Sequence, residues 1–282
     1  MGTALRAQSG GGFVVMSAAS RLGLPAAVAG RLGTGPIATM IANRLRNEGL
    51  EILLPLVEGE QGLAFGMVEP DGERTFVTAP GVESELTRAE LDSVRVGPDD
   101  AIVVSGYDLL YPSAGPAIMS WVQELPAEAL LFFDPGPLVA EIPEKLLDLA
   151  FARADVLGLN RREVSLLTGI GPDGGEQRAK DWIFGELKQE DVVVLVREGE
   201  AGSRLCRRGG VVVEFPAPAG EVVDTTGAGD VHTGAFLAEL ARGADVVEAA
   251  RVATIAASMS VREPVSAGGP TRAALDAFMA AL

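Results

Sequence analysis

The sequence predicts an α/β protein with a doubly wound, mostly parallel sheet and a smaller β-sheet beside it. Helix-like and strand-like runs alternate along most of the 282 residues, which is typical of a parallel sheet covered by helices. Two strand-like runs, 101–104 and 192–196, are continuously apolar, as strands buried on both faces are. Residues 51–80 differ, because Glu-Gly and Asp-Gly turns separate their β-like runs with no helix between them. We therefore expect a core of residues 1–50 and 81–282, and a small sheet of residues 51–80.

Hydrophobic periodicity and turn residues predict the order of the elements. Strands are expected at 24–30, 51–57, 63–68, 74–78, 101–105, 130–134, 156–159, 192–196 and 211–214. Helices are expected at 14–22, 37–47, 113–124, 143–152, 161–168, 176–189, 231–242, 244–261 and 271–282. Gly243 should end the helix at 231–242, because glycine commonly closes a helix.

The composition excludes several classes of protein. A formal net charge of −16 argues against a nucleic-acid partner, which would require a basic face. No apolar run reaches the roughly 18 to 20 residues that span a bilayer, and the N-terminus lacks the apolar segment of a secretion signal. The single cysteine, Cys206, cannot form an internal disulfide and is expected to pack as a small apolar residue. These features predict a cytoplasmic protein with no membrane partner.

The stretch Asp224-Thr225-Thr226-Gly227-Ala228-Gly229-Asp230 carries the strongest chemical signal. It precedes a predicted helix, whose first N–H groups lack partners and whose dipole attracts an anion. The Gly-Ala-Gly turn keeps side chains away from those groups. Asp230 beside this turn could take a proton from a hydroxyl that attacks a phosphoryl group. A plain helix start after a flexible loop is the alternative for a lone Gly-x-Gly, and the complete motif favours the chemical interpretation.

This motif resembles the signature of the PfkB/ribokinase-like carbohydrate kinases. The resemblance implies a ribokinase-like fold and transfer of a phosphoryl group from ATP to a sugar or nucleoside hydroxyl. It also implies that Asp230 is the catalytic base and that Gly227, Ala228 and Gly229 form the anion hole. In this family the small sheet covers the sugar and is often the dimer contact, so a homodimer through residues 51–80 is expected.

Two further matches concern Mg²⁺ and the nucleotide. Asn160 and Glu163 match the family's Asn-x-x-Glu, which helps to hold Mg²⁺ and its waters; a capping box at a helix start is the structural alternative. Arg197, Gly199 and Gly202 resemble the nucleotide-binding turn, for which a surface hairpin is the alternative.

Other residues of the expected nucleotide and cation sites match the family less closely. Thr225, Thr254 and Ala257 are expected to complete the nucleotide site, although the family frequently has Asn where Thr254 stands. Asp224 and Thr226 match positions that in some relatives bind a monovalent cation such as K⁺. Val265 stands where those relatives often have Gly.

The acceptor end departs from the family. Gly11 and Gly12 match its Gly-Gly-x-x-x-Asn motif and would contact the substrate together with Asp230, but Val14 stands where Asn is expected. The family's first strand, with an aspartate that binds the sugar, has no counterpart before Gly10. Loss of both contacts would weaken sugar binding by several orders of magnitude. An unusual acceptor, a misplaced start codon and a loss of activity are three open interpretations.

Two alternative functions compete with an active sugar kinase. A catalytically impaired relative would act as a nucleotide- or sugar-binding module. The run Gly33 to Ala38 imitates the dinucleotide fingerprint Gly-x-Gly-x-x-Ala, with Glu51 at a suitable distance, and would favour an NAD-dependent oxidoreductase. His232 lies two helical steps, about 200°, from Asp230, so we expect it to be packed or solvent-facing and not a catalytic partner.

Overall fold

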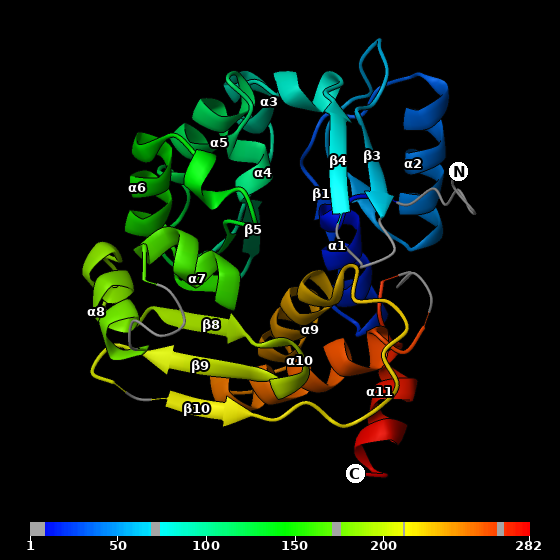
Figure 1. The fold of residues 1–282 in the computed structure, drawn as a ribbon. Coiled ribbons are helices and arrows are strands. Elements are labelled where there is room, and N and C mark those ends of the chain that lie inside the picture. The colour runs from blue at the N-terminus through cyan, green and yellow to red at the C-terminus, as the bar shows by residue number, and fades with distance from the viewer. Residues whose placement is uncertain (1–8, 69–73, 171–175, 211, 264–267) are drawn as a thin grey trace.

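The computed structural model describes residues 9–68, 74–170, 176–210, 212–263 and 268–282. A six-stranded sheet in the order β10-β9-β8-β7-β6-β5 forms its centre (Figure 1). Strands β5 to β8 pair in parallel, whereas β9 and β10 are antiparallel. The predicted α/β class and mostly parallel central sheet are therefore confirmed.

Most elements lie close to the expected ranges, although the strands expected at 24–30 and 51–57 are only two residues long and the helices at 88–91 and 106–109 were not expected. The strands of the central sheet are β5 (Ala101–Ser105), β6 (Leu130–Asp134), β7 (Val156–Asn160), β8 (Val193–Arg197), β9 (Ser203–Arg207) and β10 (Val212–Phe215). The other strands are β1 (Ala27–Val28), β2 (Glu51–Ile52), β3 (Leu63–Val68) and β4 (Arg74–Ala79). The helices are α1 (Gly11–Arg21), α2 (Pro36–Asn47), α3 (Arg88–Leu91), α4 (Gly106–Leu109), α5 (Ala114–Val122), α6 (Glu144–Arg153), α7 (Arg161–Thr168), α8 (Glu176–Glu186), α9 (Ala228–Ala241), α10 (Val246–Ser260) and α11 (Arg272–Met279). Short 3-10 turns occur at η1 (Val82–Glu85), η2 (Val139–Glu141) and η4 (Gly199–Ala201).

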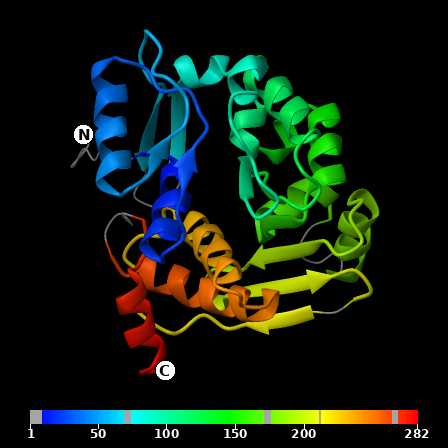
Figure 2. The same ribbon diagram turned by 180° about the vertical axis from the view of Figure 1, so that it is seen from behind.

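Helices cover both faces of the central sheet, as Figures 1 and 2 show from opposite sides. Strand β6 illustrates the reason, because its consecutive residues point to opposite faces. Phe132 packs edge-on against Phe236 of α9, with ring centroids 6.2 Å apart. Phe133 packs against Phe151 of α6 at 6.1 Å. Both phenylalanines of the strand are fully buried, which explains why a run without alternation forms a strand.

Helix α1 packs closely along α9. A Cβ at Gly234 of α9 would collide with the carbonyl oxygen of Val15 in α1, so only glycine permits this approach. A Cβ at Gly11 would lie 3.0 Å from Oδ1 of Asp230, which shows that the starts of the two helices meet. The predicted end of α9 is also confirmed, since Gly243 follows it at a φ of 90°.

The N-terminal part contains two small sheets, one parallel and one antiparallel. Strands β1 and β2 pair in parallel, with Ala27 opposite Glu51, and β3 and β4 form an antiparallel hairpin. Residues 51–57 were expected to belong to the same small sheet as β3 and β4. This expectation was wrong for Glu51 and Ile52, which pair with β1. Helix α2 supplies the crossover that a parallel β1–β2 pair requires. Residues 51–80 as a separate unit remain a prediction.

One carboxylate ties both ends of the β3–β4 hairpin to the rest of the chain. Glu83 accepts hydrogen bonds from the backbone N–H of Gly62 at 2.9 Å and of Gly81 at 2.8 Å. The oxygen that accepts from Gly62 also accepts a hydrogen bond from Nε2 of Gln61 at 2.8 Å. These hydrogen bonds fix both ends of the hairpin, while its apolar side chains are exposed.

Candidate active site

The turn at the start of α9 forms a set of free backbone donors. Gly227 adopts a left-handed conformation with a φ of 77°, which favours glycine. Oδ1 of Asp224 accepts a hydrogen bond from the N–H of Thr226 at 2.9 Å, and the N–H of Ala228 donates to the carbonyl of Thr225 at 3.3 Å. The N–H groups of Gly229 and Asp230 have no acceptor in the part of the chain that the structure describes. Together with the dipole of α9, they can bind an anion.

Asp230 lies where α1 and α9 meet. Burial and, to a smaller extent, the negative charge of Asp134 raise the pKa of its carboxyl group, the positive charge of Arg197 lowers it, and the resulting pKa is about 6. A carboxylate with this pKa is ionised at neutral pH and is a stronger base than an exposed aspartate. Gly12, unlike Gly11, faces open space, because a Cβ there would meet nothing within 4 Å.

Arg197 connects the ends of three neighbouring strands. Its Nη1 lies 2.8 Å from Oδ2 of Asp134 at the end of β6 and donates to the carbonyl oxygen of Gly229 at 3.4 Å. Its Nη2 lies 3.5 Å from Oε2 of Glu163, after β7. The guanidinium group thus lies beside the turn of α9, and 16% of its side chain is exposed.

Asp134 and Tyr107 were missed by the sequence analysis. Asp134 ends β6, just as Asn160 ends β7 and Arg197 ends β8; polar residues that end consecutive parallel strands are a signal that could have identified it. Tyr107 lies in α4, directly after β5, and is half-exposed. Partial burial and the nearby carboxylates of Glu163, Asp230 and Asp134 raise the pKa of its hydroxyl group, so Tyr107 faces the same site.

Asn160 and Glu163 form the capping box that was the structural alternative. Oδ1 of Asn160 accepts from the N–H of Glu163 at 2.9 Å, and Oε2 of Glu163 accepts from the N–H of Asn160 at 2.7 Å. The Asn160 Nδ2 group donates to the other carboxylate oxygen at 2.7 Å. Glu163 is buried, and burial raises its pKa. Because both side chains are already engaged, they suit contact with Mg²⁺ through water and not direct coordination.

The expected nucleotide-binding residues lie around the β8–β9 turn. Gly199 and Gly202 both have positive φ angles, 63° and 99°, and a Cβ at Gly202 would collide with the carbonyl oxygen of Phe215. Thr254 is buried; its hydroxyl group donates to Ala250 at 2.9 Å and lies 2.6 Å from Oγ of Ser203 in β9. Its side chain therefore joins α10 to β9.

Thr225, which precedes α9, is exposed, and Ala257 on α10 is partly exposed. Val265, which bears on the monovalent-cation site, lies outside the described residues.

The dinucleotide-like run has a different structural purpose. The carboxylate of Glu60 accepts hydrogen bonds from the N–H groups of Ala38 at 2.9 Å and Ile37 at 3.2 Å, at the start of α2. Gly35 packs directly against the same carboxylate. The donors that would bind a pyrophosphate are thus occupied by the protein's own anion, which argues against the oxidoreductase alternative.

The predicted packing of Cys206 and His232 is confirmed. Cys206 is 3% exposed and lies in β9. His232 is 2% exposed, and burial lowers its pKa to about 3, so it is neutral at physiological pH.

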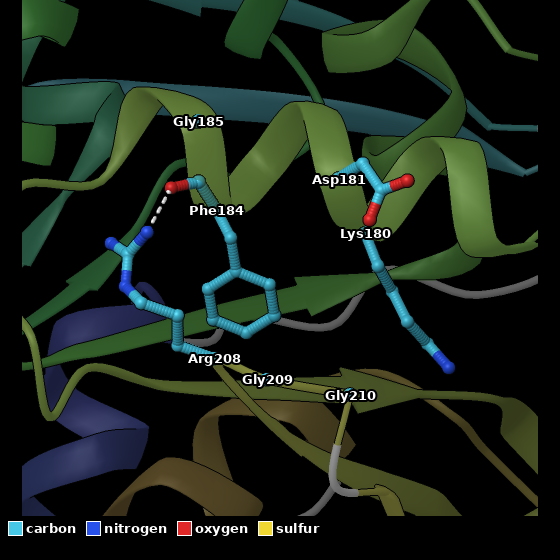
Figure 3. A pocket seen from close by; sticks show the side chains of 7 residues that line it. All are labelled: Lys180, Asp181, Phe184, Gly185, Arg208, Gly209 and Gly210. Carbon is cyan, nitrogen blue, oxygen red and sulfur yellow. Dashed lines mark hydrogen bonds between the residues drawn. The ribbon is translucent and has the colours of Figure 1, made fainter.

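A cavity of about 580 Å³ lies away from this site, between α8 and the β9–β10 turn (Figure 3). Arg208 from the turn donates to the carbonyl oxygens of Phe184 at 2.7 Å and Leu187 at 2.9 Å. It also lies over the Phe184 ring at 5.8 Å. Arg208 thereby satisfies carbonyl groups at the C-terminal end of α8, which is a structural role.

Comparisons with known proteins identify the family. Residues 6–272 match the family described as pfkB family carbohydrate kinase. The chain is 36% identical over 259 residues to the uncharacterized sugar kinase YegV of Escherichia coli K12, and this match covers 90% of the chain and 78% of that protein. The ribokinase of Arabidopsis thaliana in complex with ribose and ATP superimposes with a TM-score of 0.78 at 24% identity, covering 96% of this chain and 87% of that one.

A ribokinase-like protein of E. coli solved with ATP and Mg²⁺ superimposes with a TM-score of 0.82 at 21% identity, covering 100% of this chain and 94% of that one. At this identity the likeness shows the fold. The match to the family covers most of the sequence, and the chain therefore belongs to the pfkB family of carbohydrate kinases. The resemblance inferred from the Asp224–Asp230 motif is confirmed. Among the described residues, no helix is both long and apolar enough to cross a membrane.

Proposed function

We propose that this protein transfers the γ-phosphoryl group of ATP to a hydroxyl group of a sugar or nucleoside. The observation that carries the proposal is the position of the Asp230 carboxylate beside the unpaired N–H groups at the start of α9. This arrangement puts a base and an anion-binding turn next to each other, and phosphoryl transfer to an alcohol requires both.

The residues around Asp230 account for each part of the reaction. The carboxylate takes the proton from the acceptor hydroxyl as the oxygen forms its bond to the γ-phosphorus, and the bond to the β-γ bridging oxygen breaks to release ADP. The backbone of Gly227, Ala228 and Gly229 would form the hole for the transferring group, with the N–H of Gly229 the free donor within it. Gly11 and Gly12 would border the acceptor, because α1 begins against Asp230.

The nucleotide would lie along the β8–β9 turn and the start of α9. Arg197, Gly199, Gly202 and Thr225 lie on these two segments, and Thr254 and Ala257 lie on α10. Similar proteins solved in complex with ATP and Mg²⁺ or with ribose and ATP support the choice of co-substrate.

Mg²⁺ would reach the protein mainly through the nucleotide and water. Among the described residues, no group of three acidic, histidine or cysteine side chains is placed to hold a metal ion. Asn160 and Glu163 would orient the waters around Mg²⁺, which when bound neutralises charge on the phosphates. A K⁺ site at Asp224 and Thr226 remains a prediction.

The test is the Asp230→Asn variant in an assay of ADP release over pentoses, hexoses and nucleosides. We expect turnover to fall by at least about a thousandfold, because the base of the reaction is removed. Asp276→Asn, at an exposed carboxylate on α11, is the matched control and should retain full activity. Undiminished turnover by the Asp230 variant would reject the mechanism. Binding of ATP without turnover of any acceptor by the wild type would favour the impaired-module alternative.

The β3–β4 hairpin is proposed as a lid and a dimer contact. Phe65, Met67 and Val77 on one face of this hairpin and Phe76 on the other are between 55% and 62% exposed, and exposed apolar side chains that lie together often mark protein contacts. We expect light scattering to show a dimer, and Phe65→Ser with Phe76→Ser to yield monomers. A monomeric wild type would exclude this contact.

A cytoplasmic location is part of the proposal. It is supported by the single buried Cys206, which suits a reducing compartment. Fractionation of cells that express the tagged protein would test it.

A further inference from the structure

The proposed reaction gives no role to Asp134, although its carboxylate is held by two contacts near Asp230. Its Oδ1 accepts from the N–H of Gly136 at 3.1 Å, and its Oδ2 lies 2.8 Å from Nη1 of Arg197. The first contact fixes the carboxylate on its own turn, and the second fixes the guanidinium group. About one fifth of the Asp134 side chain is exposed, at 21%, so its charge is only partly screened by water.

Arg197, which Asp134 holds in place, contacts the turn at the start of α9. Its Nη1 reaches the carbonyl oxygen of Gly229 at 3.4 Å, and a Cβ at Gly229 would lie 3.0 Å from the same nitrogen. The guanidinium group thus fills the space directly beside the residue that precedes Asp230. Without Asp134, the remaining strong partner would be Glu163, whose carboxylate lies on the other side at 3.5 Å.

We propose that Asp134 is a positioning residue that holds Arg197 against the Gly229 carbonyl, and that this ion pair sets the position of Asp230 and the charges that face it. The inference rests on the proposed role of Asp230 as the base. It assigns a task to an ion pair that joins residues 63 positions apart in the sequence. A planar guanidinium group suits the task, because it can contact two carboxylates and a carbonyl at fixed angles.

Other titratable groups lie near Asp230 and Arg197. Glu163 lies on α7 and Tyr107 on α4, and the charge of Asp134 raises the pKa of both side chains. Helix α1 contributes Gly11, which carries no charge. His232 on α9 is neutral at physiological pH, because burial lowers its pKa to about 3. Asp134 and Arg197 are therefore the pair of opposite charges that acts on Asp230.

The first experiment measures the titration of Asp230 in the protein without substrates, by ¹³C NMR of labelled aspartate carboxyl groups. The signal that disappears in Asp230→Asn identifies the residue. Asp134→Asn keeps an acceptor for Arg197 but removes the negative charge, so the pKa of Asp230 should fall from about 6. Arg197→Met should raise the pKa, because the opposing positive charge is lost. Shifts in opposite directions are not expected from a merely structural pair.

The second experiment separates position from charge by kinetics. Asp134→Ala frees Arg197 and should lower kcat at neutral pH by at least about tenfold, since a displaced catalytic group loses rate steeply. Asp134→Asn should restore kcat to within about threefold of the wild type. Equal kcat values for these two variants, or an unchanged Asp230 titration in Asp134→Asn, would overturn the inference.

The control is an ion pair of the same kind at the opposite, amino-terminal end of the parallel strands, just before β7. Asp155 lies 2.7 Å from Nη1 of Arg153 and also accepts from the N–H of Leu131 at 2.7 Å. Asp155→Asn should leave the pKa of Asp230 and kcat unchanged. If Asp230→Asn itself remained active, the proposed function would fail; the NMR titration would still decide whether the ion pair sets the pKa of Asp230.

Discussion

Replacement of Asp230 by Asn should remove activity and at the same time stabilise the folded protein. In the folded state the pKa of Asp230 is about 6, above its ordinary value of 3.8. The folded protein therefore binds the proton more tightly than the unfolded chain does. By linkage, the wild type loses stability as the pH rises from about 4 to about 6, and Asp230→Asn does not.

The structure gives the size of the effect. A difference of about two pH units corresponds to about 3 kcal/mol, since each unit is about 1.4 kcal/mol. The side chain of Asp230 retains partial solvent contact, which reduces the estimate to about 2 kcal/mol. For a chain of this length, that difference raises the melting temperature by roughly 4 °C at neutral pH.

The assay is thermal and urea unfolding of both proteins between pH 4 and pH 7.5. The stability difference should be full at pH 7.5 and nearly absent at pH 4, where the wild-type carboxyl group is protonated in the folded state. A gain that is the same at both pH values would mean that Asn improves packing and that ionisation is not involved. Equal stability at pH 7.5 would refute the raised pKa.

Three further predictions follow from contacts near the site and at α2. Gly11→Ala should lower kcat by at least about tenfold with an unchanged circular dichroism spectrum, because its Cβ would lie only 3.0 Å from Oδ1 of Asp230; Gly185→Ala on α8, where a Cβ would meet nothing within 4 Å, is the control, and equal losses would contradict the explanation. The value of kcat/KM should fall about tenfold per pH unit below pH 6, since Asp230 must be ionised to accept a proton; a flat profile down to pH 5 would exclude it as the base. Glu60→Gln should lower the melting temperature at neutral pH without affecting kcat, because the carboxylate that pairs with the start of α2 is lost; an unchanged melting temperature would show that the charge is dispensable.

Local patterns predicted most of the fold. The apolar run at 192–196 indicated β8, and the observed strand, Val193–Arg197, is displaced by one residue. The parallel β1–β2 pair was not predicted, because two-residue strands carry almost no periodicity and their pairing depends on the crossover through α2. Helix α4 was also missed, since four residues are too short to give a helical pattern.

The sequence by itself determined the location of the proposed active site, because the Gly-Ala-Gly turn, the following helix and Asp230 are adjacent along the chain and their geometry is local. Only the tertiary structure decided what surrounds that carboxylate. Gly11 reaches it by the packing of α1 on α9, and Asp134 acts through Arg197 across neighbouring strand ends. Such contacts depend on how separate elements pack, and periodicity, capping and turn preferences, which act over a few residues, do not specify them.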